Sequence, residues 1–246
     1  DSEIDTSNSR VLDYTSARMK KEKSEFYRLC GGSLGGKARG LAFARTMIKQ
    51  SGINTDFDQV TIRVPNCVVV GTDEFDLFMK DNQLWKKALQ LSDNKKLERA
   101  FKKARLSLDL MLKLELFIKD NQYPLAVRSS SLLEDSQYQP LAGTYETIML
   151  PNNSRSNKKR LKELITAIKC VFASTFKGEA KSLLDNTSHR IEEEKMAVII
   201  QEIVGQSYES NRFYPTFSGV LKSVNYYPVS YMERDEGVAY LALGFG

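Results

Sequence analysis

The sequence predicts a mixed α/β protein, because segments with helical periodicity alternate with short runs of β-branched and other apolar residues. Lys159 to Phe176 carries its apolar side chains on one helical face, and Ala38 to Gln50 is rich in helix-forming residues. Val60 to Thr72 and Met196 to Val204 are instead rich in valine and isoleucine, which favour strands. The 246 residues are enough to bury one substantial core or two smaller lobes.

The longest predicted helical region covers residues 83–120. Its second half is crowded with leucines, a pattern that is typical of a helix facing a hydrophobic core. Ser92-Asp93-Asn94 interrupts the periodicity. The region is therefore expected either as one helix or as two helices with a break at these residues.

Composition and charge are ordinary for a globular protein, with 41% hydrophobic and 27% charged residues. Lysine and arginine exceed aspartate and glutamate by 36 to 31, and the basic residues are mixed with acids, so we predict no nucleic-acid partner. No apolar run approaches the ~20 residues that cross a bilayer, and the first residues are polar. We therefore predict no membrane partner and a cytoplasmic location.

Cysteine and histidine usage excludes several kinds of site. Cys30, Cys67 and Cys170 are odd in number and far apart, which argues against a disulfide framework and against a zinc site. Cys67 and Cys170 stand in apolar runs and are expected to be small core residues. Cys30 lies beside a glycine-rich segment, but no sequence feature marks it as a nucleophile. The single histidine, His189, stands in a polar stretch and is expected at the surface.

A glycine-rich segment is the first candidate for ligand binding, and it follows a helical pattern that runs from Arg10 to Leu29. Its glycines allow positive φ angles and a close approach to a ligand, and a lysine, Lys37, comes directly after them. The segment nearly matches a P-loop, but Ala38 stands where a P-loop has Ser or Thr for magnesium. A helix end, not a strand, is also expected before it. The four glycines are Gly31, Gly32, Gly35 and Gly36.

Two interpretations of this segment remain. In the first, it forms a flexible cover over phosphates, and Lys37 reaches them. In the second, it is a plain helix–helix turn with a solvated lysine.

The second candidate is the end of the apolar run Pro124 to Val127, where Arg128 and three serines follow. A guanidinium is always charged and can bridge two phosphate oxygens, while hydroxyl groups bind further oxygens. Ser131-x-x-Glu134 matches a capping box, which would begin a short helix with N–H groups available to an anion. The residues therefore predict a polyanion site; the alternative is a structural arginine beside a capped turn.

These segments together resemble one family. Val127 to Asp135, followed by Ala142-Gly143 and Thr147, is similar to the V-R-S-S-(A/S)-x-x-E-D…F-A-G-x-x-x-T signature of the N-terminal ATP-binding domain of the pyruvate phosphate dikinase and phosphoenolpyruvate synthase family. Gly35 to Ala38 resembles the family's G-G-K-(A/G), and Met196 to Val204 resembles its M-A-V-V-(V/I)-Q-x-M-V. Other blocks depart in part, for example Phe245 for the leucine of G-L-G.

The resemblance covers residues 30–246 and implies an α+β fold of the ATP-grasp-like kind. Two lobes, with largely antiparallel sheets flanked by helices, would clamp ATP between them. Residues 1–29 would be an N-terminal helical extension. The family's metal ligands and carrier-histidine motif follow the G-L-G block, so the domain is expected to be incomplete at its C-terminus.

The resemblance also implies a role for individual residues. Arg128 and Lys37 would be the catalytic residues and would bind the ATP phosphates. Mg²⁺ is expected with ATP, but its ligands would lie beyond Gly246, and Glu134 and Asp135 are not convincing ligands, so no metal site is predicted here. The remaining cofactor-binding residues would be Gly35, Gly36, Ser129, Gly143 and Thr147 near the phosphates and Gln201, Glu202 and Ile203 along the adenine.

The implied reaction transfers a phosphoryl group from ATP to a carrier histidine on another domain and then to pyruvate. The partners would be ATP and the downstream phosphohistidine and acceptor-binding domains of the same polypeptide, and these residues alone are expected to be inactive. One alternative is a degenerate nucleotide-binding or regulatory module without turnover. Another keeps the chemistry but changes the acceptor to an antibiotic or a glucan.

Overall fold

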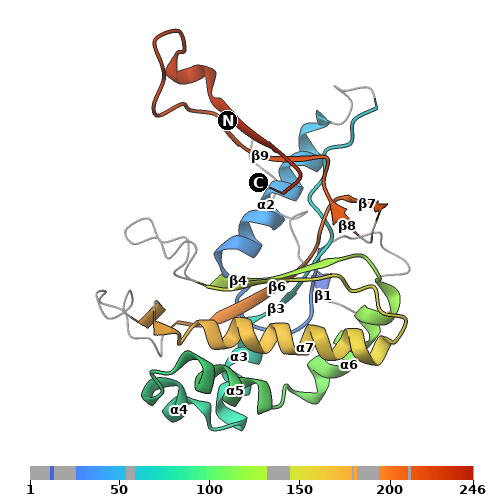
Figure 1. Ribbon diagram of the computed structural model, residues 1–246, viewed down its shortest axis with the longest axis vertical. Helices are drawn as coiled ribbons and strands as arrows, with labels where there is room; N and C mark the ends of the chain where they lie inside the picture. The colour runs from blue at the N-terminus through green and yellow to red at the C-terminus, as the bar shows by residue number, and fades with distance from the viewer. Residues whose placement is uncertain are drawn as a thin grey trace. The chain divides into compact units, whose positions relative to one another are not determined.

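The computed structural model describes residues 12–13, 26–53, 59–131, 145–178, 180–181, 194–209 and 212–245. The chain divides into two compact units, Asp1–Glu202 and Ile203–Gly246. The first unit contains a mixed sheet with helices on both faces (Figure 1). This agrees with the mixed α/β class that the alternating patterns predict.

Six strands form the sheet of the first unit, in the order β1-β2-β3-β6-β4-β5. The first three strands are parallel to one another, and the β3–β6, β6–β4 and β4–β5 pairs are antiparallel. β6 is therefore a central strand, and β5 lies at an edge. The strands are β1 (Leu12–Asp13), β2 (Phe26–Arg28), β3 (Cys67–Val70), β4 (Leu125–Ser131), β5 (Thr147–Leu150) and β6 (Met196–Glu202).

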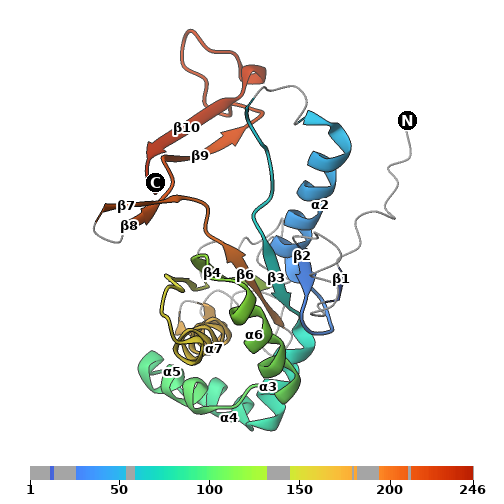
Figure 2. The same ribbon diagram turned by 90° about the vertical axis from the view of Figure 1, so that its right-hand side faces the viewer.

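The helices divide between the two faces of this sheet. Figure 2 shows α2 on one side and the others on the opposite side. Beneath α2 lies a small apolar cluster that includes Cys67 and Val69, whereas Val68 and Val70 enter the larger core. This alternation along β3 follows from the two-residue period of a strand. The helices are α2 (Gly35–Ser51), α3 (Thr72–Asp81), α4 (Leu84–Gln90), α5 (Asn94–Lys103), α6 (Leu108–Asp120) and α7 (Asn157–Ser174).

Aromatic side chains fill the larger core. The Phe172 ring lies 5.2 Å from that of Phe75 and 5.4 Å from that of Phe78, measured between ring centroids. Phe176 packs against Phe101 at 5.8 Å. The apolar face of α7 is therefore buried in this core, as its helical periodicity predicts.

The second unit consists of two antiparallel pairs of strands. β7 (Gln206–Tyr208) pairs with β8 (Arg212–Tyr214), and β9 (Phe217–Lys222) pairs with β10 (Val238–Leu243). A short 3₁₀ helix, η5 (Arg234–Glu236), precedes β10.

The prediction of a helix from Arg10 to Leu29 is wrong where the structure describes these residues. Leu12–Asp13 and Phe26–Arg28 are strands of the main sheet. Phe26 and Tyr27 are both buried, because β2 is covered on both faces. A strand buried on both faces loses its apolar–polar alternation, so periodicity does not distinguish it from a buried helix.

The region 83–120 contains three helices, whereas the sequence predicts one or two. The break at Ser92-Asp93-Asn94 is confirmed, because Asp93 caps α5 by accepting hydrogen bonds from the N–H groups of Lys95 and Lys96 at 2.8 and 3.2 Å. A second break precedes α6, where the Ser107 hydroxyl accepts from the Leu110 N–H at 3.2 Å. Across the described ranges, no helix is both long and apolar enough to cross a membrane.

The buried side chain of Arg160 links three segments of the chain through hydrogen bonds. One guanidinium nitrogen donates to the carbonyl of Asn121 at 2.8 Å and to the side-chain oxygen of Asn152 at 3.2 Å. The other donates to the side chain of Asn157 at 2.7 Å. Arg160 thus ties the end of α6 to the β5–α7 connection and to the first turn of α7.

Arg160→Met is expected to lower the free energy of unfolding by about 2 kcal/mol, because it leaves the side-chain oxygen of the buried Asn152 without its donor and removes the bonds to Asn121 and Asn157. Urea unfolding measured by circular dichroism checks this value. Arg155→Met is the matched control, since Arg155 is exposed on the same connection, and it should leave stability nearly unchanged. Equal stability of the two variants would contradict this role of Arg160.

Candidate functional site

The first turn of α2 rests directly on the end of β4. Gly35 has a φ of +74°, and a Cβ atom added there would overlap the carbonyl oxygen of Ser130. The Ser130 hydroxyl donates to the carbonyl of Leu34 at 2.7 Å and accepts from the N–H of Ala38 at 3.1 Å. Glycine is therefore required at position 35, and Ser130 fixes the helix start to the strand.

The glycine loop between β2 and α2 is anchored to α3. The N–H of Ser33 donates to the Thr72 hydroxyl at 2.9 Å, and the N–H of Thr72 donates back to the Ser33 carbonyl at 3.0 Å. Asp73 N–H donates to the carbonyl of Gly31 at 3.3 Å. These hydrogen bonds fix the loop to α3, in contrast to the flexible cover over phosphates that the glycines suggest.

The order strand, glycine loop, helix is that of a P-loop, contrary to the expectation of a helix end before the glycines. The other objection to a P-loop holds. Ala38 is fully buried in the cluster beneath α2 and offers no hydroxyl to a metal. The loop therefore resembles a P-loop in its local order but not in its metal-binding side chain.

Lys37 contacts the residue of β4 that follows Arg128. Lys37, in the first turn of α2, places its Nζ 3.4 Å from the Ser129 hydroxyl oxygen. Arg128, the preceding residue of β4, donates from Nη1 to Oε1 of Gln201 at 3.1 Å. Thr147 is the β5 partner of Arg128 in the antiparallel register, so the two side chains share a face of the sheet. The structure thus brings Lys37, Arg128, Ser129, Thr147 and Gln201 together.

The electrostatic character of this site is positive. α2 carries Lys37, Arg39, Arg45 and Lys49 and has no acidic residue in its sequence. The N-terminus of a helix adds a partial positive charge of about half a unit. N–H groups in the first helical turn also lack intrahelical acceptors, and Gly36 lies in this turn. The arrangement is suited to an anion with several oxygens.

Glu202, predicted along the adenine, is held by another part of the chain. Its carboxylate accepts two hydrogen bonds from Arg63, both at 3.1 Å, and one from the N–H of Asn66 at 3.2 Å. Partial burial favours a higher pKa for Glu202, but the hydrogen bonds from Arg63 and Asn66 lower the pKa below its ordinary value. Its own N–H donates to the Asn66 carbonyl at 2.8 Å. Ile203 is the first residue of the second unit.

Several predicted features lie outside the described residues. Gly143, Glu134, Asp135 and His189 are among them, so their expected roles stay predictions. Within the described ranges, no three histidine, cysteine, aspartate or glutamate side chains are grouped as a metal site requires.

The three cysteines are free thiols, and Cys67 and Cys170 are buried as expected. Burial raises the pKa of Cys30 and of Cys67 to about 12 and that of Cys170 to about 11. All three thiols are consequently protonated at neutral pH. A thiol in this state is a poor nucleophile.

Sequence reasoning missed Arg63 and the structural role of Ser130. Ser130 fixes the start of α2, and Arg63 holds Glu202. Strand alternation gives a signal for Ser130. It stands two residues after Arg128 on β4, so the two side chains face the same side of the sheet. Arg63 gave no such signal, since it contacts a residue 139 positions away.

Similarity to known proteins identifies the family of this chain. The family model described as the AMP/ATP-binding domain of pyruvate phosphate dikinase matches residues 32–246. An uncharacterized phosphotransferase of Bacillus subtilis (strain 168), YvkC, is 28% identical over 175 residues. These residues are 70% of this chain but only 18% of that protein, so the chain spans less than a fifth of this relative. The family match covers most of the chain, and the chain therefore belongs to the family of pyruvate phosphate dikinase AMP/ATP-binding domains.

Proposed function

We propose that this domain binds ATP with its phosphates at the N-terminus of α2, between Lys37 and Arg128. The observation that carries the proposal is the contact between Lys37 and Ser129, which places a lysine of the first helical turn beside the strand residue that follows Arg128. Helix N–H groups, an ammonium and a guanidinium are donors that bind phosphate oxygens. The family match supports a nucleotide over other polyanions.

Each residue has a distinct role in this proposal. The Arg128 guanidinium, oriented by Gln201, binds two phosphate oxygens and stabilises charge on the transferring phosphoryl group. Lys37 binds a further oxygen as a point charge. Gly35 and Gly36 allow the helix start to approach the phosphates. Further phosphate contacts come from Ser129, Gly143 and Thr147, and the adenine lies along Gln201, Glu202 and Ile203.

In the longer protein, the phosphoryl group would pass from ATP to a carrier histidine on another domain and then to pyruvate. A relative described as a phosphotransferase supports this kind of chemistry. The same chemistry with an antibiotic or a glucan as acceptor is a second candidate, because acceptor choice lies in other domains. A regulatory module without turnover is a third, supported by Phe245 in place of leucine in the G-L-G block. Mg²⁺ would accompany ATP and use ligands outside the described residues.

An acyl-phosphate derivative of ATP tests the proposed binding site. The amine of a lysine beside the phosphates attacks the acyl carbon, forms an amide and releases ATP. Peptide mass spectrometry should find Lys37 as the main acylated residue, and excess ATP should suppress this modification. Lys49, at the other end of α2, is the internal control. Equal acylation of the two lysines, unaffected by ATP, would contradict the proposed site.

A further inference from the structure

A hollow lies on the face of the main sheet that is opposite α2. α5, α7 and β5 enclose it, and its volume is about 730 Å³. Ile148 pairs with Val127 of the larger core, so the Ile148 side chain points away from Arg128 and Thr147. The hollow is therefore separate from the proposed phosphate site. Its volume falls in the range of about 300–1,000 Å³ that is typical of small-molecule pockets.

The floor of this hollow is apolar. Ile148 and Leu150 of β5 are half-buried and pack on the larger core, and Ala167 of α7 is buried beside them. Thr166 lies on the same helix, where its hydroxyl donates to the carbonyl of Lys162 at 2.7 Å. The Thr166 hydroxyl is thus hydrogen-bonded within its own helix. A hydrocarbon group that lies on such a surface removes apolar area of both partners from water, which favours binding.

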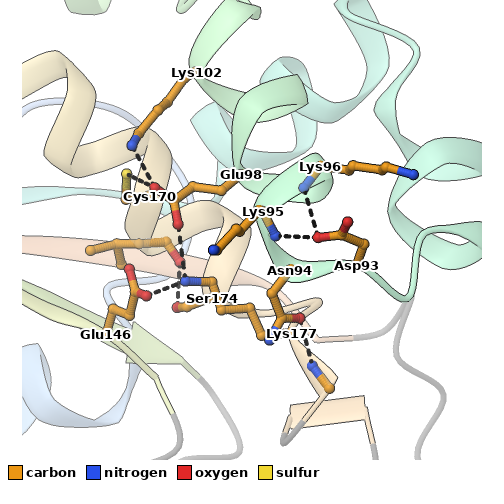
Figure 3. Close-up of polar contacts among 12 residues, drawn as sticks. Asp93, Asn94, Lys95, Lys96, Glu98, Lys102, Glu146, Cys170, Ser174 and Lys177 are labelled. Carbon is orange, nitrogen blue, oxygen red and sulfur yellow. Dashed lines mark hydrogen bonds and ion pairs between the residues drawn. The ribbon is translucent and has the colours of Figure 1, made fainter.

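The rim of the hollow consists of charged side chains that pair with one another. Glu98 binds both Lys102 and Lys177, and Lys177 also binds Glu146 (Figure 3). The hydrogen bond from Lys102 contributes most to lowering the pKa of Glu98, so this carboxylate is ionised at neutral pH. The acidic side chains of this part of the rim therefore already have lysine partners.

The remaining rim charges belong to α7. Lys159 lies 4.0 Å from Glu163, one turn along the helix. Lys162 also lines the hollow, and within the described residues no carboxylate is paired with it. Three ammonium groups and three carboxylates line the hollow, so its lining has no net charge. The ammonium group of Lys162, which has no paired carboxylate among the described residues, favours an anionic head group over a cationic one.

We propose that this hollow is a binding site for a small amphiphilic carboxylate. The hydrocarbon part lies on Ile148, Leu150 and Ala167, and the carboxylate lies beside Lys162. A nucleotide is a poorer match, because its sugar and phosphates are polar and only its base could lie on the apolar floor. The site is independent of the proposed ATP function, and its occupant belongs to a different chemical class.

Decanoate is the probe for this site, with decylamine and decanol as matched ligands of the same chain length. Titration followed by methyl NMR should show decanoate binding with shifts at Ile148 and Leu150, and decylamine should bind more weakly. Thr166→Phe, which places a ring in the hollow, should weaken binding about tenfold or more, as the loss of two buried methylenes would. Lys162→Ala should weaken it about threefold to fivefold.

Lys103→Ala is the control, because Lys103 is exposed on α5 and does not line the hollow. It should bind decanoate as the unmodified protein does. If a variant fails to fold, intermolecular NOEs between decanoate and the Ile148 methyl groups of the unmodified protein still test the proposal. A non-hydrolysable ATP analogue should leave decanoate bound. Absence of these NOEs, displacement by the analogue, or equal binding by Thr166→Phe would overturn the proposal.

Discussion

Arg128→Ala is expected to lower ATP-dependent phosphorylation by the full-length protein by about a hundredfold or more. Arg128 is the middle residue of β4, which β6 and β5 flank. Nη1 of Arg128 donates to Oε1 of Gln201 at 3.1 Å, so the guanidinium is oriented before a nucleotide binds. An oriented cation that faces developing charge acts without reorganisation, which is why its loss has a large effect on the rate.

Two further variants separate charge from geometry. Arg128→Lys keeps the charge but loses the planar fork, so it should recover only part of the activity. Gln201→Ala should lower the rate less than Arg128→Ala, because the guanidinium remains but is no longer oriented. Arg99→Ala, an exposed arginine on α5, is the control and should be fully active. The comparison uses initial rates of phosphate incorporation from labelled ATP.

The possible outcomes of this experiment have different meanings. Full activity of Arg128→Ala would contradict the assigned role of Arg128. Absence of ATP turnover in the unmodified full-length protein, with ATP still bound, would instead favour the regulatory module over a phosphotransferase.

Gly35→Ala is expected to lower the free energy of unfolding by about 3 kcal/mol, through a strained positive φ and an overlap with the β4 backbone. The added methyl group would meet the carbonyl oxygen of Ser130, an atom that cannot move without breaking the strand. The start of α2 would therefore lift from β4 and carry Lys37 away from Ser129. ATP affinity should fall together with stability.

Gly40→Ala is the matched variant, and its expected effect has the opposite sign. Gly40 lies in the same helix, and no atom lies within 4 Å of a Cβ atom added there. Replacement of a helical glycine by alanine stabilises by about 0.5–1 kcal/mol. Thermal and urea unfolding of both variants give the comparison. A Gly35→Ala protein as stable as Gly40→Ala would show that α2 does not begin against Ser130.

The parts of the fold that the sequence predicts are those with a local signal. α7 has an uninterrupted amphipathic pattern, and Asp93 has the side chain of a helix cap, so both are recovered from periodicity and capping. β2 has no such signal, because its burial on both faces depends on β3 and α2, which come later in the chain. Its aromatic residues match a helix and a strand equally well.

The candidate site shows the same division. Arg128 and Lys37 can be proposed as site residues from the sequence alone, because they stand in short motifs with recognisable chemistry. The bonds that place them, from Ser130 to the start of α2 and from Gln201 to Arg128, join residues 92 and 73 positions apart. Such contacts depend on the order of the strands in the sheet, and no local pattern in this sequence predicts that order.

A crystal structure of the protein with a non-hydrolysable ATP analogue tests the central claim most directly. The account predicts phosphate oxygens within hydrogen-bond distance, about 3 Å, of both the Lys37 ammonium and the Arg128 guanidinium. It also predicts that the phosphates face the first turn of α2. An analogue whose phosphates contact neither side chain would contradict the account.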